Sequence, residues 1–171
     1  MTEKHPLKSR KGIYILKNNF YRFWFKFIFP NTEDIERKRQ DYLLTAKIMP
    51  ELDRFTSLAF EEICKEWLWK LTLFNYDKIG RWWEKEEEID IVAVNDSEKR
   101  ILFAECKWQE KVDAERVLHE LRSKAKAVEW NTNRTESYAI FAKSCIRKIR
   151  HDNVHIFELS DLKNYLSPSV Q

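Results

Sequence analysis

Three charged side chains interrupt two apolar stretches of the sequence. Asp90 lies within residues 88–94, and Glu105 and Lys107 lie within residues 100–108. Nearly continuous hydrophobic runs of this length are typical of central strands, where a charge is costly unless it is paired, bound to metal or used in chemistry. Residues 105 and 107 leave the same face of a strand, about 7 Å apart. If the strand of Asp90 lies alongside, all three groups converge at one edge of a sheet.

This set of residue types suits hydrolysis assisted by a metal ion. Two carboxylates, Asp90 and Glu105, together with water are ligands that Mg²⁺ (or Mn²⁺) accepts in an octahedral shell. The ammonium of Lys107 would orient or deprotonate an attacking water, or neutralise charge that develops on a phosphate. The alternative is an ordinary Glu–Lys ion pair at the end of a strand.

A further acid is predicted from the long helical pattern of residues 51–74. Its apolar stripe is centred near Phe60 and Leu71. Glu61 lies about 100° from Phe60 around the helix, at the rim of the core, whereas Glu62 lies about 200° away and faces solvent. Glu61 is therefore the acid expected to face the sheet. The alternative is a glutamate on an ordinary helix surface.

The hydrophobic period predicts the elements that must position these residues. Apolar residues at helical spacing alternate along the chain with short β-rich runs bounded by polar turns. Their order predicts an α/β fold with a mixed sheet flanked by helices. A basic arm with an aromatic helical extension is expected over residues 1–50, and one domain over 51–171. The predicted helices are 20–29, 33–49, 51–74, 113–129 and 161–166, and the predicted strands are 79–84, 88–95, 100–108, 137–143 and 154–158.

Composition excludes several classes of protein. The 171 residues are 43% hydrophobic and 35% charged, which is enough for one packed core and a solvated surface. Gly12 and Gly80 are the only glycines, so the chain has no glycine-rich loop of the Walker or Rossmann type. The three cysteines form no CxxC pair, which argues against a disulfide framework and favours the reducing cytoplasm.

The aromatic segment 20–29 does not have the form of a membrane span. It is about half as long as a bilayer requires and contains Arg22 and Lys26. Its apolar residues follow helical spacing, Asn18 or Asn19 can cap the start, and Pro30 marks the end. We therefore expect a helix that docks on a core or on a partner, and no membrane contact.

Basic residues gather in two places. Residues 1–30, which include Lys17, carry seven Lys or Arg against one Glu, and a second group contains Arg147, Lys148 and Arg150. Such clusters bind the phosphate backbone of DNA in many proteins. A solvated tail or contact with an acidic partner protein remains the alternative.

A resemblance extends this interpretation. Asp90, followed after fourteen residues by Glu105-Cys106-Lys107, is similar to the D…(D/E)xK signature of the PD-(D/E)xK nuclease superfamily. The longer segments resemble the C-terminal nuclease-like domain of a family of archaeal AAA-type ATPases, in which an ATPase domain and a winged helix-turn-helix come first. The segments that carry this resemblance are 12–31, 60–64, 79–83, 88–94 and 105–108.

The resemblance implies a restriction-endonuclease-like core of order αβββαβ. It assigns metal binding to Asp90 and Glu105, the catalytic lysine to Lys107 and a weaker acidic role to Glu61. Ile89 stands where the named motif has proline. The implied function is a Mg²⁺-dependent deoxyribonuclease that hydrolyses a phosphodiester with a metal-activated water.

The alternative is a catalytically inactive DNA-binding or assembly module that kept this fold. It would act with an ATPase or winged-helix partner protein, and this chain would then be a split or truncated relative of the longer proteins. The sequence does not define the oligomeric state or the DNA structure preferred.

Overall fold

The computed structural model describes residues 16, 18–147 and 149–166. These residues fall into two compact units, and the division lies between Ala59 and Phe60, inside one long helix. The sequence placed this division at residue 50. None of the described helices is both long enough and apolar enough to pass through a bilayer.

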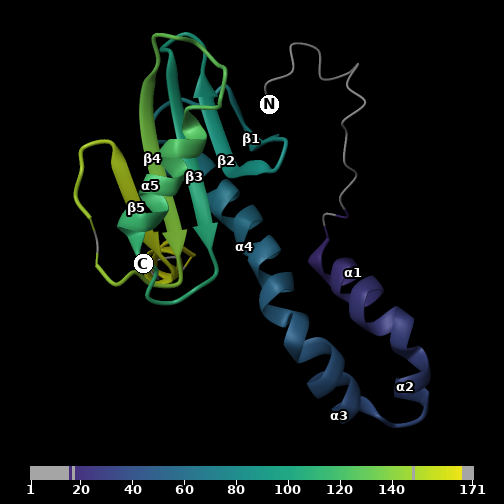
Figure 1. Cartoon of the computed structure of the whole chain (residues 1–171). Helices are drawn as coiled ribbons and strands as arrows, with labels where there is room; N and C mark the ends of the chain where they lie inside the picture. Colours follow the sequence, from purple (N-terminus) through teal and green to yellow (C-terminus); the bar gives the residue numbers. More distant parts are fainter. Residues whose placement is uncertain (1–15, 17, 148, 167–171) are drawn as a thin grey trace, which may run out of the picture. The chain divides into compact units, whose positions relative to one another are not determined.

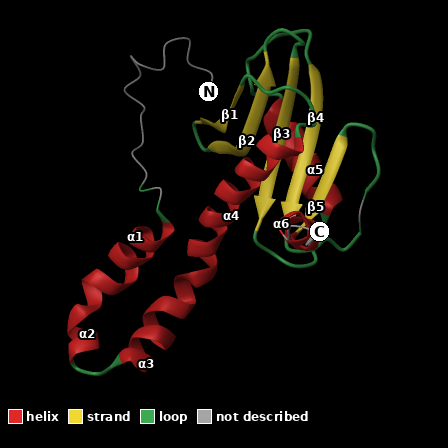
Figure 2. Cartoon of the chain, turned by 180° about the vertical axis from the view of Figure 1, so that it is seen from behind, coloured by secondary structure: helices red, strands yellow, loops and turns green. Residues whose placement is uncertain are grey.

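The second unit is built on a five-stranded mixed sheet in the order β1-β2-β3-β4-β5 (Figures 1 and 2). The first three strands pair antiparallel, whereas β3, β4 and β5 pair parallel. The predicted α/β class with a mixed sheet is thus confirmed, and each predicted strand is found within two residues of its predicted bounds. The strands are β1 (Lys78–Glu84), β2 (Glu87–Asn95), β3 (Arg100–Lys107), β4 (Thr135–Ala142) and β5 (Val154–Glu158).

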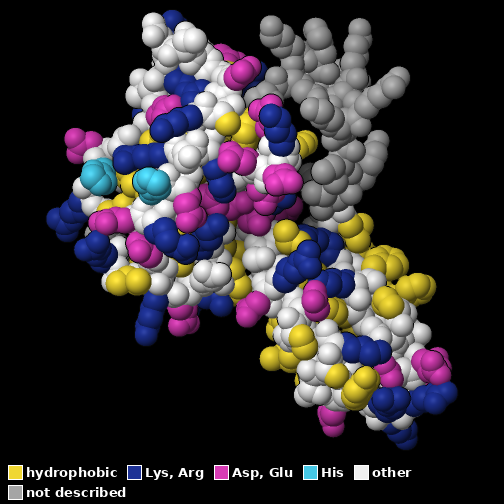
Figure 3. Space-filling view, viewed as in Figure 1, with side chains coloured by type: hydrophobic (Ala, Val, Ile, Leu, Met, Phe, Trp, Pro, Cys, Tyr) yellow, Lys and Arg dark blue, Asp and Glu magenta, His cyan; other side chains and the backbone are white. Residues whose placement is uncertain are grey.

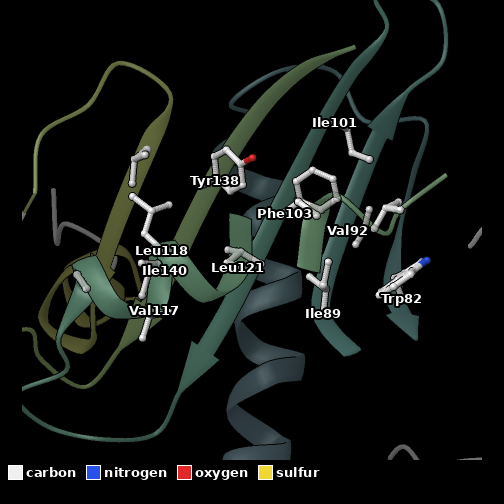
Figure 4. Close-up of a cluster of buried hydrophobic side chains, with 14 of the residues drawn as sticks. Trp82, Ile89, Val92, Ile101, Phe103, Val117, Leu118, Leu121, Tyr138 and Ile140 are labelled. Carbon is white, nitrogen blue, oxygen red and sulfur yellow. The ribbon is translucent and has the colours of Figure 1, made fainter. Parts of the chain in front are cut away.

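Helices cover both faces of this sheet (Figure 2). On one face α5 (Ala114–Ala125) packs Leu121 against Phe103 and Tyr138 (Figure 4). On the other face, the end of α4 (Met49–Leu71) and α6 (Leu159–Leu166) share a core with Phe141. Each fully buried large side chain contributes about 1.5–3 kcal/mol. These two cores fix β2 and β3 in the middle of the unit.

Polar groups define the ends of α5. The Asp113 carboxylate caps the start by accepting from the backbone N–H groups of Glu115 and Arg116, at 3.1 and 3.2 Å. Beyond the end, the Arg134 guanidinium donates to the backbone oxygens of Ala125 and Trp130, at 2.8 and 2.9 Å. The Ala125 oxygen also accepts the N–H of Val128 at 3.2 Å, so the guanidinium adds to the bonds that tie the loop after α5 to the helix end. The helix ends at residue 125, whereas the sequence predicted an end at residue 129.

The first unit is a set of short helices around a small aromatic core. Asn18 caps its first helix, as predicted, by accepting from the N–H of Phe20 at 2.9 Å, and Phe27, Leu43 and Ile48 are buried together. The elements are α1 (Asn19–Phe23), a π-helical turn (Trp24–Ile28), a 3-10 turn (Phe29–Asn31), α2 (Thr32–Glu36), α3 (Gln40–Tyr42) and a second π-helical turn (Leu43–Ile48).

The prediction that a helix ends before Pro50 is wrong. Helical structure continues from Gln40 through Leu71, and Pro50 lies in the first turn of α4. Proline donates no N–H to the helix, and the π-helical turn Leu43–Ile48 directly before α4 already replaces the regular α-helical ladder at this point. The interruption lies earlier, at Lys38, whose φ of 58° is incompatible with a right-handed helix.

Candidate functional site

A β-bulge sets the position of Asp90. Across residues 80–82, β1 has a single intervening residue, whereas the facing part of β2 has two, Asp90 and Ile91. A bulge of this kind bends the strand and re-aims a side chain. Pairing of β2 with β3 begins at Ile91, and just before it the Oδ2 atom of Asp90 accepts the backbone N–H of Cys106 at 2.8 Å. The Asp90 carboxylate therefore lies against β3, beside Glu105.

Glu105 is a buried carboxylate held by two ammonium groups. Its side chain is 4% exposed. Oε2 accepts from Nζ of Lys107 at 2.8 Å, and Oε1 accepts from Nζ of Lys124 at 2.6 Å. Lys107 comes from the same face of the same strand, as the spacing predicted, while Lys124 comes from the last turns of α5. Charge-assisted bonds of this length are among the strongest that a carboxylate makes.

Lys124 was missed by sequence reasoning, although a signal was present. Residues 117, 121 and 128 are buried apolar positions at helical spacing, and residue 124 completes that series on the same face. A lysine in a core series is expensive to bury without a partner. Only the packing of α5 on β3 shows that this partner is Glu105.

Asp90 is the electrostatically disfavoured member of the group. Burial and, after it, the nearby charge of Glu105 raise the pKa of Asp90 from 3.8 to about 7, against the lowering effect of the Cys106 N–H and of Lys107. Burial alone would lower the pKa of Lys107, but its hydrogen bond to Glu105 and the two carboxylate charges raise it above the ordinary value. Near neutral pH the site therefore combines a fully charged lysine with a half-protonated acid.

Glu61 lies in a neighbouring ion-pair cluster. It projects from α4 and pairs with Arg81 of β1, whose guanidinium also lies 3.9 Å from Glu88. Burial raises the pKa of Glu61 above its ordinary value, and Arg81 opposes this. The charge of Glu61 adds to the disfavoured ionisation of Asp90. Glu61 thus influences the site by raising the pKa of Asp90, while its carboxylate is ion-paired with Arg81.

The donor chemistry of the site fits a hard divalent cation through two carboxylates. Among the described residues, no group of three or more His, Cys, Asp or Glu side chains is arranged to hold a metal ion. Asp90 is nevertheless a buried carboxyl group whose ionisation is disfavoured, and its Oδ1 atom is not used by the Cys106 bond. A cation bound there would also need an oxygen of Glu105 as a ligand, and both oxygens are bonded to lysines.

In the described part of the chain, the basic residues expected to contact DNA do not form a continuous positive surface with the candidate site. Arg147 is 70% exposed and pairs with Glu115 at 2.9 Å, and Arg150 is exposed. Lys17 and Lys148 lie outside the described residues. Positive and negative side chains alternate over the face that carries α5 (Figure 3). This face is therefore mixed in charge.

Comparisons with known proteins place the chain in a family. The model of the DUF234 family, described as archaeal and bacterial proteins of unknown function, matches residues 24–117, which is more than half of the chain. Uncharacterized protein MJECL04 of Methanocaldococcus jannaschii is 36% identical over 162 residues, and the match covers 91% of this chain. The chain spans only 36% of that relative's length. The comparison with solved structures gave no significant match. The chain therefore belongs to the DUF234 family.

Proposed function

We propose that the sheet domain of this chain is a metal-dependent DNA endonuclease of the PD-(D/E)xK type. The observation that carries the proposal is the convergence of Asp90, Glu105 and Lys107 where β2 meets β3, on two strands that are otherwise largely apolar and buried. Two acids and one lysine in such a place are expensive to maintain as structure alone, because buried charges rarely repay their desolvation.

The order of elements supports the same proposal. The series α4-β1-β2-β3-α5-β4 agrees with the αβββαβ core that the resemblance implies, and the sheet is mixed with helices on both faces. The bulge in β2 adds a second argument, since bulges are frequent beside active sites, where they aim a side chain. In this protein Asp90 is one of the two residues in the bulge, with Ile91.

Each residue has a distinct role in the proposed reaction. Asp90 and Glu105 would hold Mg²⁺ or Mn²⁺, and the bound cation would supply a nucleophilic water and stabilise charge on the phosphate. Lys107 orients that water and neutralises the phosphate oxygens, because its raised pKa keeps it protonated. The bulge and the Cys106 N–H hold Asp90 toward β3, and the two cores around β3 exclude bulk water from Glu105.

Cleavage of linear, branched and single-stranded DNA in Mg²⁺ and in Mn²⁺ tests this proposal. We expect cleavage by the unmodified chain and none by Lys107→Ala, with cation binding retained because an ammonium is not a metal ligand. Lys126→Ala is the matched control, since it removes an exposed lysine at the end of α5. The proposal is refuted if the chain binds DNA but never cuts it and Lys107→Ala binds identically.

One observation favours a second function, an inactive DNA-binding or assembly module. Phe20, Tyr21, Phe25 and Phe29 of the first unit are each exposed over about half of their surface or more. Aromatic side chains gathered on one helical segment are typical of a docking face. In this proposal the partner is an ATPase or winged-helix protein, and Glu105 with its two lysines is a structural ion-pair network. DNA binding without cleavage is the result it predicts.

A further inference from the structure

The two lysines that hold Glu105 determine whether its carboxylate is free to bind a metal ion. Both carboxylate oxygens already accept a charge-assisted bond, from Lys107 at 2.8 Å and from Lys124 at 2.6 Å. The carboxylate is buried and cannot turn toward another partner without leaving both. Two ammonium groups at this distance also repel a divalent cation. Glu105 is therefore blocked as a metal ligand while both lysines remain in place.

The two lysines differ from Glu105 in their access to solvent. The side chain of Lys107 is 33% exposed and that of Lys124 is 27% exposed, against 4% for Glu105. Part of each lysine side chain therefore faces solvent, whereas Glu105 does not, so an anion that reaches the site from solution meets the lysines before the carboxylate. A phosphate oxygen offers a lysine the same kind of charge-assisted bond as a carboxylate oxygen. A polyanion at the site thus competes with Glu105 for both lysines.

We infer that Lys124, with Lys107, occupies Glu105 until a phosphate-bearing polymer draws the two ammonium groups away, so that a divalent cation and DNA bind this site cooperatively. The inference rests on the proposed function, because it takes Asp90 and Glu105 as the cation ligands. It assigns Lys124 a positioning role that acts through Glu105. Cation affinity should be weak without DNA and should rise when DNA is present.

Linkage fixes how the two affinities are related. If DNA raises the affinity for the cation by some factor, the cation raises the affinity for DNA by the same factor. Couplings of this kind are commonly 5- to 150-fold, and we expect about tenfold here. The two factors can be measured separately, so their agreement is itself part of the test.

Direct binding measurements on the full chain test the inference. Mn²⁺ binding is measured by the loss of the free-ion paramagnetic signal, alone and with a short phosphorothioate duplex that resists cleavage, after subtracting Mn²⁺ bound by the duplex. DNA affinity is measured by fluorescence anisotropy with and without Mn²⁺ at constant ionic strength. We expect a rise of about tenfold in each affinity.

Three variants separate a specific role of Lys124 from general electrostatics. Lys124→Gln frees one Glu105 oxygen, so Mn²⁺ affinity without DNA should rise about tenfold and the coupling should shrink. Lys126→Gln makes the same charge change at the exposed end of α5 and should alter Mn²⁺ affinity less than about twofold. Lys124→Arg keeps a cation at the position, is less disruptive to folding, and should restore both the weak Mn²⁺ affinity and the coupling.

The outcomes distinguish this inference from the function beneath it. DNA cleavage without any coupling between Mn²⁺ and DNA would leave the nuclease proposal standing and overturn the role of Lys124. Equal Mn²⁺ affinities for the Lys124→Gln and Lys126→Gln variants would overturn it as well. A chain that binds no Mn²⁺ with or without the duplex would end both the proposed metal site and the inference.

Discussion

Asp90→Asn is expected to stabilise the protein in neutral and alkaline solution. The carboxyl has a pKa of about 7 in the folded protein and an ordinary value of 3.8 when unfolded. Below about pH 4 both states hold the proton. Between about pH 4 and pH 7 only the folded state holds the proton, so the free energy of unfolding falls as pH rises. Above pH 7 the full loss of stability remains. At 1.36 kcal/mol per pH unit this interval corresponds to about 4 kcal/mol.

The asparagine removes this cost and keeps part of the local bonding. Its side-chain oxygen can still accept the Cys106 N–H, although an amide is a weaker acceptor than a carboxylate by about 1 kcal/mol. The gain in unfolding free energy should therefore be about 3 kcal/mol at pH 8. It should be about 2–3 kcal/mol larger at pH 8 than at pH 5, because most of the Asp90 cost develops between those two values.

Urea denaturation at pH 5 and pH 8, in buffer that contains a chelator, measures this difference. Asp152→Asn is the control: it removes an exposed carboxylate in the turn before β5 and should leave the pH dependence as in the unmodified chain. The reasoning is refuted if Asp90→Asn is less stable than the unmodified chain at pH 8, or if its pH dependence matches that of Asp152→Asn.

Other predictions concern the core, the end of α5 and the cation. Leu121→Ala, at a fully buried position, should lower the unfolding free energy by about 2–5 kcal/mol in urea denaturation; a loss below about 1 kcal/mol would contradict the packing described. Arg134→Ala should cost about 2–3 kcal/mol because it removes charge-assisted bonds to two backbone carbonyls, and Arg134→Lys should recover only part of this, since an ammonium lacks the planar fork. In calorimetry, Mn²⁺ at about 100 times its dissociation constant should add about 2.7 kcal/mol to stability, and Asp90→Asn should abolish that gain; an unchanged melting temperature of the unmodified chain would argue for the inactive module.

Sequence alone located the elements that carry the site. β2 and β3 were predictable because their apolar runs end at polar turns, and β5 was predicted with its observed bounds of residues 154–158. The shared face of Glu105 and Lys107 followed from the period of two along a strand. These properties are local, since each depends on neighbours within a few residues.

The sequence did not predict which residues at the edge of the apolar stripe of α4 are buried, because neighbouring elements determine this. Ile63 lies three residues after Phe60 and so falls beside it on α4, yet it is 43% exposed, while Leu68 is fully buried. The helical pattern allows either residue at the edge of the stripe. The sheet and α6 determine which edge of α4 is covered.

Tertiary structure alone decided how the charges are combined. The bulge that aims Asp90 arises from the mismatch between β1 and β2, which no single strand reveals. The bond from Lys124 to Glu105 joins residues nineteen apart, and that from Arg81 to Glu61 joins residues twenty apart. Periodicity determines which face of its own element a residue occupies. Which residue it meets across the interface depends on the packing of whole elements, and here that packing placed the second lysine on Glu105.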